Sequence, residues 1–302
     1  MKGFLENIDD KQIDLVCIYS LPRSGSTALI AELDRIEGIV CLPESYFPQV
    51  IELLTSTEQL DPYVLAAFFL ASSPSGALLS FQEAVDCMVP GNHQQTFKRL
   101  GLAMAHKTKR EPSKIKTVVW KTTRIIGKWR LFANAEGRFI ILRRNPVNVF
   151  DSQFRVDFGR FNRNTLRFSA FKESYEAIFS RMPTDLCLSV DYESILEQLP
   201  NINNWLGVQG TSWVDVDSSI AQTHGKNDWH NGVMEGFESS DAIKRKNITG
   251  KQLMMLEISQ KITKPFRPLL ALLRDYFDSQ IMKQIRKDAE EIMDIQSRKK
   301  LN

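Results

Sequence analysis

Residues 15–33 read LVCIYSLPRSGSTALIAEL, an apolar run followed by a loop of small residues and a second apolar pattern. The first run is typical of a buried β-strand, whereas Leu29, Ile30, Leu33 and Ile36 recur at the spacing of one helix face. The first turn of a helix has free backbone N–H groups and a positive dipole end, which suit an anion. The stretch predicts a strand, a phosphate-binding loop and a helix; an ordinary turn capped by serine is the alternative.

The side chains of the loop fit a phosphate group. Ser24, Gly25 and Ser26 are small, so an anion can approach their backbone closely. Arg23 adds a positive charge and Thr27 adds a hydroxyl group. We expect all five residues to bind the anion.

Similar short apolar runs recur along the chain, at residues 39–42, 117–120, 139–142 and 186–190. Because helical patterns separate them, they predict a central parallel sheet flanked by helices, a three-layer α/β sandwich of the P-loop type. Residues 50–110 are expected to form a mostly helical insertion, and residues 264–302 a C-terminal helical extension. Without repeats or an evident linker, residues 1–302 are expected to form one domain.

The loop departs from the Walker A pattern, Gly-x-x-x-x-Gly-Lys-Ser/Thr, in an informative way. Gly25 and Thr27 fit that pattern, but Ser20 replaces its first glycine and Ser26 its lysine. The strand at 139–142 is followed by two arginines, at 143 and 144, where a nucleotide triphosphatase often carries a Mg²⁺-binding aspartate. We therefore expect positive side chains in place of a metal ion.

Three segments together resemble the sulfotransferases that use 3′-phosphoadenosine 5′-phosphosulfate (PAPS). LPRSGST (21–27) is similar to their 5′-phosphosulfate loop, and Arg144 with Ser152, eight residues apart, to their 3′-phosphate element. Asn145 can cap a helix that starts at Pro146 and carries Ser152 two turns along. VDYESIL (190–196) with WLGV (205–208) resembles a third segment, in which Tyr192 approaches the adenine. The resemblance implies PAPS as donor and the 3′,5′-bisphosphate (PAP) as product.

Other positions match the pattern of that family only weakly or depart from it. His224 and Lys226 weakly resemble a further 3′-phosphate loop. Ala28 stands where the cytosolic branch has an adenine-stacking tryptophan, and residues 121–123 lack that branch's catalytic histidine. The chain therefore looks closer to the carbohydrate and protein-tyrosine branches.

The resemblance also implies the catalytic groups. Glu44, just after the second strand, matches the glutamate base, and Lys121 matches the lysine that stabilises the transferring group, with Arg23 beside it. His93 and His106 are the other candidate bases. Because ligands bind at the carboxyl ends of parallel strands, groups that follow strands directly are expected to converge there.

Composition limits the partners. The net charge of +3 is too small to favour nucleic acid. Residues 98–144 hold fourteen Lys or Arg and two acids, an excess of twelve, which suits a compact polyanion or a solvated basic face. Four scattered cysteines and a first segment without a secretory pattern favour a cytoplasmic protein, and no apolar run is long enough to span a membrane.

The preferred function is transfer of a sulfuryl group to an acceptor hydroxyl, with a sugar hydroxyl favoured. The alternatives are a Mg²⁺-dependent phosphotransferase of the same architecture and an inactive nucleotide-binding scaffold. The C-terminal helix is expected to pack on the body of the protein, with a contact in a homodimer or with a partner protein as the alternative.

Overall fold

The computed structural model describes residues 12–73, 78–155, 164–208 and 248–301. In these residues five strands form one sheet in the order β2-β3-β1-β4-β5, and every neighbouring pair is parallel. The predicted α/β architecture with a central parallel sheet is confirmed. The strands are β1 (Asp14–Ser20), β2 (Ile39–Glu44), β3 (Thr117–Thr122), β4 (Gly137–Arg143) and β5 (Cys187–Asp191).

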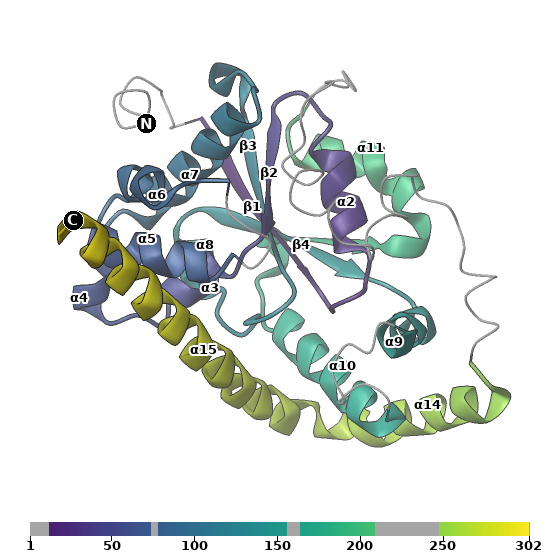
Figure 1. Cartoon of the computed structure of the whole chain (residues 1–302). Coiled ribbons are helices and arrows are strands. Elements are labelled where there is room, and N and C mark those ends of the chain that lie inside the picture. The colour runs from purple at the N-terminus through teal and green to yellow at the C-terminus, as the bar shows by residue number, and fades with distance from the viewer. Residues whose placement is uncertain (1–11, 74–77, 156–163, 209–247, 302) are drawn as a thin grey trace.

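Helices cover both faces of the sheet, as expected. Successive side chains of a strand point to opposite faces, so β1 sends Val16 and Ile18 into one buried cluster and Cys17 and Tyr19 into the other. The helices α2 (Ser26–Leu33) and α11 (Ile195–Trp205) pack on the first face (Figure 1). The second face carries α3 (Phe47–Ile51), α5 (Pro62–Ala71), α6 (Phe81–Cys87), α7 (His93–Lys107), α8 (Arg130–Asn134), α9 (Pro146–Arg155), α10 (Thr165–Phe179) and α15 (Arg267–Leu301).

The expected helical insertion consists of several separate helices, most of which begin at a capping side chain. α3 to α7, with α4 at Ser56–Gln59, lie between β2 and β3 and are followed by the 3₁₀ turn η1 (Pro112–Lys114). Asp61, Ser80 and Asn92 accept hydrogen bonds from the first backbone N–H groups of α5, α6 and α7. These caps explain why the apolar segments break into separate helices.

The helix after the phosphate loop is shorter than its apolar pattern suggests. α2 ends at Leu33, so Ile36 lies in the following turn rather than on the helix, although it is still buried. Asp34 is the C-cap residue, and its buried carboxylate accepts the Cys41 N–H at 2.8 Å and pairs with Arg110 at 3.1 Å. Gly38, at φ 89°, then leads the chain into β2.

The C-terminal region packs on the body of the protein. α14 (Gly250–Thr263) and the 3₁₀ turn η6 (Lys264–Phe266) lead into α15, which runs along the outside of the molecule past α10 and α5 (Figure 1). Arg274 and Asp278 of α15 form a buried ion pair, 2.9 Å between Nε and Oδ1. No described helix has both the length and the apolar character needed to cross a membrane.

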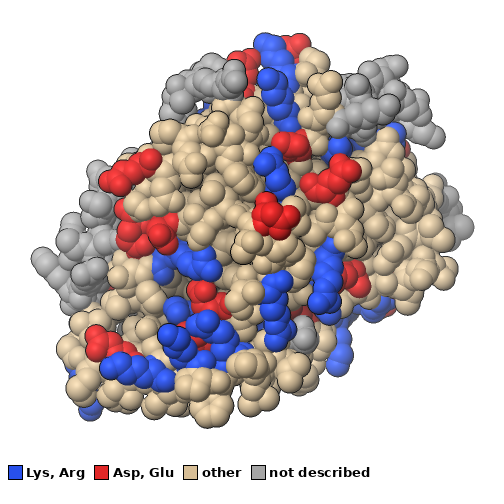
Figure 2. Space-filling view, turned by 180° about the vertical axis from the view of Figure 1, so that it is seen from behind, with Lys and Arg blue, Asp and Glu red and all other residues tan. Residues whose placement is uncertain are grey.

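The basic stretch between residues 98 and 144 does not form one surface. Lys98 and Arg110 are buried, while Lys107, Arg138 and Arg143 pair with acids from other segments. On the face seen in Figure 2, basic and acidic side chains are interspersed. Much of the excess charge in this stretch therefore serves the fold.

Candidate active site

The loop after β1 has a backbone shape that side chains rarely adopt. The Ser24 N–H donates to the Leu21 carbonyl at 3.1 Å, with Pro22 second and Arg23 third in the turn. Arg23 has φ 74°, as the third residue of a type II turn requires, although it is not a glycine. A non-glycine residue in this region is strained, and such strain often marks functional positions.

Polar groups at the start of α2 have no hydrogen-bond partner among the described residues and could bind an anion. Gly25, at φ 89°, stands at the N-cap and supplies no side-chain hydrogen bond, so the loop is not the serine-capped turn that was the alternative. The Ser24 hydroxyl is buried and has no hydrogen-bond partner among the described residues, and the same holds for Ser20. Buried hydroxyls without a partner are costly, and an anion bound at this helix terminus would satisfy them.

Tyr192 lies directly on the loop. It begins the 3₁₀ turn η3 (Tyr192–Ser194) after β5, and a Cβ atom placed on Gly25 would lie 2.1 Å from Cε2 of its ring. The guanidinium carbon of Arg144 is 4.3 Å from the centre of the same ring. Only glycine fits at residue 25, and the three residues form one contact group.

The helix α9 brings Ser152 to the same place. The Asn145 side chain accepts the Val147 N–H at 2.9 Å and Pro146 is the first helical residue, so the predicted cap is confirmed. Nε of Arg23 donates to the Ser152 hydroxyl at 3.2 Å. An Nη atom of Arg144 donates to the Arg23 carbonyl at 3.3 Å.

Lys121 joins the loop to the proposed base. Its side chain is only 3% exposed, and Nζ lies 2.8 Å from the Thr27 hydroxyl and 3.2 Å from Oε2 of Glu44. One ammonium group therefore contacts both the first turn of α2 and the end of β2.

A bulge in the edge strand β2 aligns Glu44 with Lys121. Cys41 pairs with Val119, but Glu44 pairs with Lys121, so three steps on β2 match two on β3. Regular pairing would place Glu44 beside Thr122, whose side chain points to the other face. Pro43 lies within the shift and has no N–H for the ladder, which explains the irregularity. β2 therefore extends through Glu44, two residues beyond the predicted end at Leu42.

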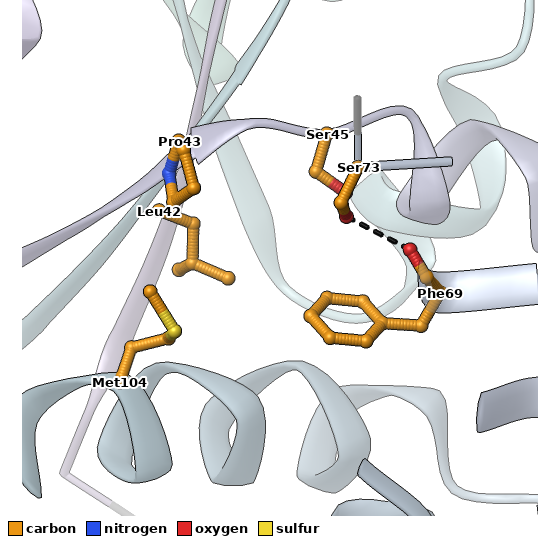
Figure 3. A pocket seen from close by; sticks show the side chains of 6 residues that line it. All are labelled: Leu42, Pro43, Ser45, Phe69, Ser73 and Met104. Carbon is orange, nitrogen blue, oxygen red and sulfur yellow. Dashed lines mark hydrogen bonds between the residues drawn. The ribbon is translucent and has the colours of Figure 1, made fainter. Parts of the chain in front are cut away.

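A small pocket lies beside this bulge (Figure 3). The side chains of Leu42, Phe69 and Met104 line it together with Pro43, Ser45 and Ser73. The Ser73 hydroxyl donates to the Phe69 carbonyl at 2.8 Å and lies 2.9 Å from the Ser45 hydroxyl. These hydrogen bonds join the segment that follows Glu44 to the end of α5.

The Glu44 carboxylate is held by several donors. Oε1 accepts the Tyr46 hydroxyl at 2.8 Å and also the Thr123 hydroxyl. Burial alone would raise the pKa of Glu44, but Lys121, these two hydrogen bonds and the charge of Arg124 lower it to about 2. Glu44 is therefore a carboxylate at neutral pH.

The structure brings together most of the residues expected from the sequence. The contacts above join four of them around residues 24–27: Arg23, Arg144, Ser152 and Tyr192. Lys121 connects Thr27 to Glu44. The two histidines lie on α7: Nε2 of His93 is 3.3 Å from Gln59, and His106 is exposed in the last turn. His224 and Lys226 lie outside the described residues.

Tyr46 and Thr123 were not expected at the site. Each stands two residues after a group that the sequence did indicate, Glu44 and Lys121 respectively. A hydroxyl two residues after a proposed catalytic side chain is the signal that the sequence carries for both residues.

Comparisons with known proteins find distantly similar structures but no similar sequence. No protein-family model matches the chain, and no curated protein matches it by sequence. A sulfotransferase domain from the curacin biosynthetic pathway is 19% identical, covering 66% of this chain and 75% of its own, with a TM-score of 0.40. Mouse sulfotransferase SULT7A1 complexed with PAP is 15% identical, covering 91% and 93%, with a TM-score of 0.41.

The fold and the site define a class by themselves. The chain is an α/β protein with a central parallel sheet and an anion-binding type of loop between its first strand and a helix. Cationic side chains and the carboxylate of Glu44 meet at the carboxyl ends of its strands.

Proposed function

We propose that the chain is a PAPS-dependent sulfotransferase that moves a sulfuryl group to an acceptor hydroxyl and releases PAP. The observation that carries the proposal is the position of Lys121, with Nζ 2.8 Å from the Thr27 hydroxyl and 3.2 Å from Glu44. A group transferred between a phosphate on the loop and a hydroxyl near the carboxylate would pass this ammonium.

The donor would be bound by the loop and its neighbours. Residues 24–27 offer backbone N–H groups and hydroxyls to the 5′-phosphosulfate, and the buried Ser24 hydroxyl supports this fit. Arg144 and Ser152, with Arg23 between them, would hold the 3′-phosphate through charge-assisted hydrogen bonds. Tyr192 would contact the adenine, and His224 and Lys226 are weaker candidates for the 3′-phosphate.

The chemistry would be an in-line displacement. The acceptor oxygen attacks sulfur while Glu44 takes the hydroxyl proton, the bond from sulfur to the bridging phosphate oxygen breaks, and PAP leaves with that electron pair. Lys121 and Arg23, with the loop N–H groups, would stabilise the charge that builds on the sulfuryl and leaving oxygens. A carboxylate with a pKa of about 2 is a weak base, so Lys121 would have to turn from Glu44 toward the donor before proton transfer.

Several further features belong to the proposal. The acceptor is an alcohol, with a sugar hydroxyl favoured by the resemblance to the carbohydrate branch together with the cationic Arg124 and Lys121 near Glu44. The reaction needs no metal ion, and residues 1–302 act as one cytoplasmic domain. The exposed apolar residues of α15, among them Leu272 and Tyr276, are the surface that a homodimer would bury.

The test is calorimetric titration of the full chain with PAP beside ATP with Mg²⁺, and transfer of labelled sulfate from PAPS to a panel of alcohols. We expect PAP to bind without metal at micromolar affinity, ATP to bind far more weakly, and Arg144→Ala to weaken PAP binding. Preference for Mg²⁺-ATP would favour the phosphotransferase, and PAP binding without transfer to any acceptor would favour an inactive scaffold.

A further inference from the structure

The oxygen atoms of the Glu44 carboxylate have different surroundings. Oε1 accepts two hydrogen bonds, from the hydroxyls of Tyr46 and Thr123, and Oε2 faces Nζ of Lys121 at 3.2 Å. A carboxylate oxygen has two lone pairs in its plane, so two donors occupy Oε1 fully. Only Oε2 can accept a further proton without loss of a hydrogen bond to Tyr46 or Thr123.

The two hydroxyl donors are themselves held in place. Tyr46 is 4% exposed, and its backbone N–H donates to the Ser72 carbonyl at 2.9 Å. Thr123 is 6% exposed, and its carbonyl accepts the Tyr175 hydroxyl at 2.5 Å. Burial raises the pKa of Tyr46, so its hydroxyl stays protonated and remains a donor.

We propose that Tyr46 and Thr123 are positioning residues that saturate Oε1 of Glu44, so that Oε2 is the oxygen that receives the acceptor proton. The inference rests on the proposed sulfuryl transfer. In the reaction the acceptor O–H bond breaks as its oxygen bonds to sulfur, and the proton passes to Oε2. The two hydroxyls fix the rotation of the carboxylate about its last bond, which sets the direction of Oε2.

Loss of either hydroxyl therefore changes both the geometry and the proton affinity of Glu44. Among the described residues, the charged and titratable groups that act on it include Lys121 and Arg124 from the β3 end, Tyr46 before α3, and Tyr175 of α10. Tyr46→Phe and Thr123→Val remove donors to the ionised form but keep these charges. The pKa of Glu44 must then rise, and the acid limb of the kcat profile must move to higher pH.

The experiment measures kcat at saturating acceptor, PAP affinity and the Glu44 pKa in wild type, Tyr46→Phe, Thr123→Val and Thr123→Ser. The pKa comes from ¹³C NMR of labelled glutamate, with Glu44→Gln used to assign the signal. We expect kcat to fall about tenfold or more in the Phe and Val variants, because hydrogen bonds to charged groups are among the stronger ones. PAP affinity should stay within about twofold, and Thr123→Ser should restore kcat and pKa, as a purely steric role would not.

The outcomes separate this inference from the proposed function. Unchanged kcat and unchanged Glu44 pKa in both Tyr46→Phe and Thr123→Val, in a protein that binds PAP and transfers sulfate, would overturn the inference alone. If wild type binds no PAP, the proposed function fails and the catalytic role of Oε2 fails with it. The NMR titration would then still report whether the two hydroxyls hold the carboxylate. Tyr63→Phe, at a tyrosine that is 42% exposed, serves as the control substitution.

Discussion

At the scale of single residues, Glu44 is the proposed base of the reaction. It is a carboxylate 18% exposed, in contact with a buried ammonium and two hydroxyls. We expect Glu44→Gln to lower turnover by about 10²- to 10⁴-fold, the usual contribution of a placed base, while PAP binding persists. Steady-state rates and calorimetry measure the two effects. Glu37→Gln, at a carboxylate that is 41% exposed and paired with Lys114, is the control and should behave as wild type. Normal turnover of Glu44→Gln would remove it as the base.

Arg23 combines a strained backbone with a charge at the proposed donor site. Because its φ of 74° is favourable only for glycine, we expect Arg23→Gly to unfold at the same or higher denaturant concentration than wild type. The same change removes the guanidinium that contacts Ser152, so PAP affinity should fall about tenfold or more. Lys109, exposed and at φ 58°, offers a matched control.

Lys109→Gly should relieve similar strain without any change in PAP binding. Equal PAP affinities of Arg23→Gly and wild type would show that Arg23 is not part of the donor site, whatever its effect on stability.

The residues of the site were predictable where a short motif carries them. The loop 21–27 could be expected because a strand, a tight turn and a helix follow one another in the chain. Arg144 and Ser152 were indicated by their resemblance to a 3′-phosphate element, and the capped helix between them fixes their geometry locally. The contacts of Tyr46 and Thr123 with Glu44 depend on two strands meeting and on a bulge between them. Such contacts arise from tertiary structure, so residue order alone could not reveal them.

At the scale of elements, the bulge in β2 could not be predicted from the sequence, although it determines which residue of β3 lies opposite Glu44. An apolar run that ends at Leu42 predicts a strand ending there, because Pro43 normally interrupts pairing. In an edge strand the missing N–H is tolerated, and the extra residue brings Glu44 level with Lys121. The pattern of apolar runs therefore predicted the order of strands and helices along the chain, but not the residue pairing between β2 and β3.

The cap of α9 by Asn145 is expected to hold Ser152 in place at the proposed donor site. Asn145→Ala removes the hydrogen bond to the Val147 N–H, and it should lower the free energy of unfolding by about 1 kcal/mol. Because α9 carries Ser152, PAP affinity should fall as well. Asn164 caps α10 in the same way, accepting the N–H groups of Leu166 and Arg167 at 2.9 and 3.2 Å. Denaturant unfolding and PAP titration of both variants give the comparison.

Asn164→Ala should cost similar stability but leave PAP binding unchanged. If the two variants reduce PAP affinity equally, the effect is a general loss of stability and the cap of α9 has no special role at the site.

At the scale of the whole molecule, the long C-terminal helix α15 contacts residues that lie next to the candidate site. Asp278 of α15 accepts the Gly127 N–H at 3.3 Å, and the guanidinium carbon of Arg274 lies 4.8 Å from the centre of the Tyr175 ring. Tyr175 in turn donates to the carbonyl of Thr123. The sequence predicted a helix that packs on the body, but a helical pattern does not say which loop it will contact. α15 therefore connects the last part of the chain to the segment that carries Thr123.

The buried pair in α15 gives a prediction about the stability of the molecule. Arg274→Met leaves the carboxylate of Asp278 buried without the guanidinium group of Arg274, which should lower the free energy of unfolding by about 3–5 kcal/mol. The double variant Arg274→Met/Asp278→Leu removes both charges and should recover a large part of that loss. The exposed pair Asp294 and Arg298 on the same helix, also four residues apart, is the control, and Arg298→Met should cost about 0.5 kcal/mol or less. Denaturant unfolding of the three variants measures these differences. A double variant as unstable as Arg274→Met would mean that the loss comes from packing or from the Gly127 contact rather than from an uncompensated charge.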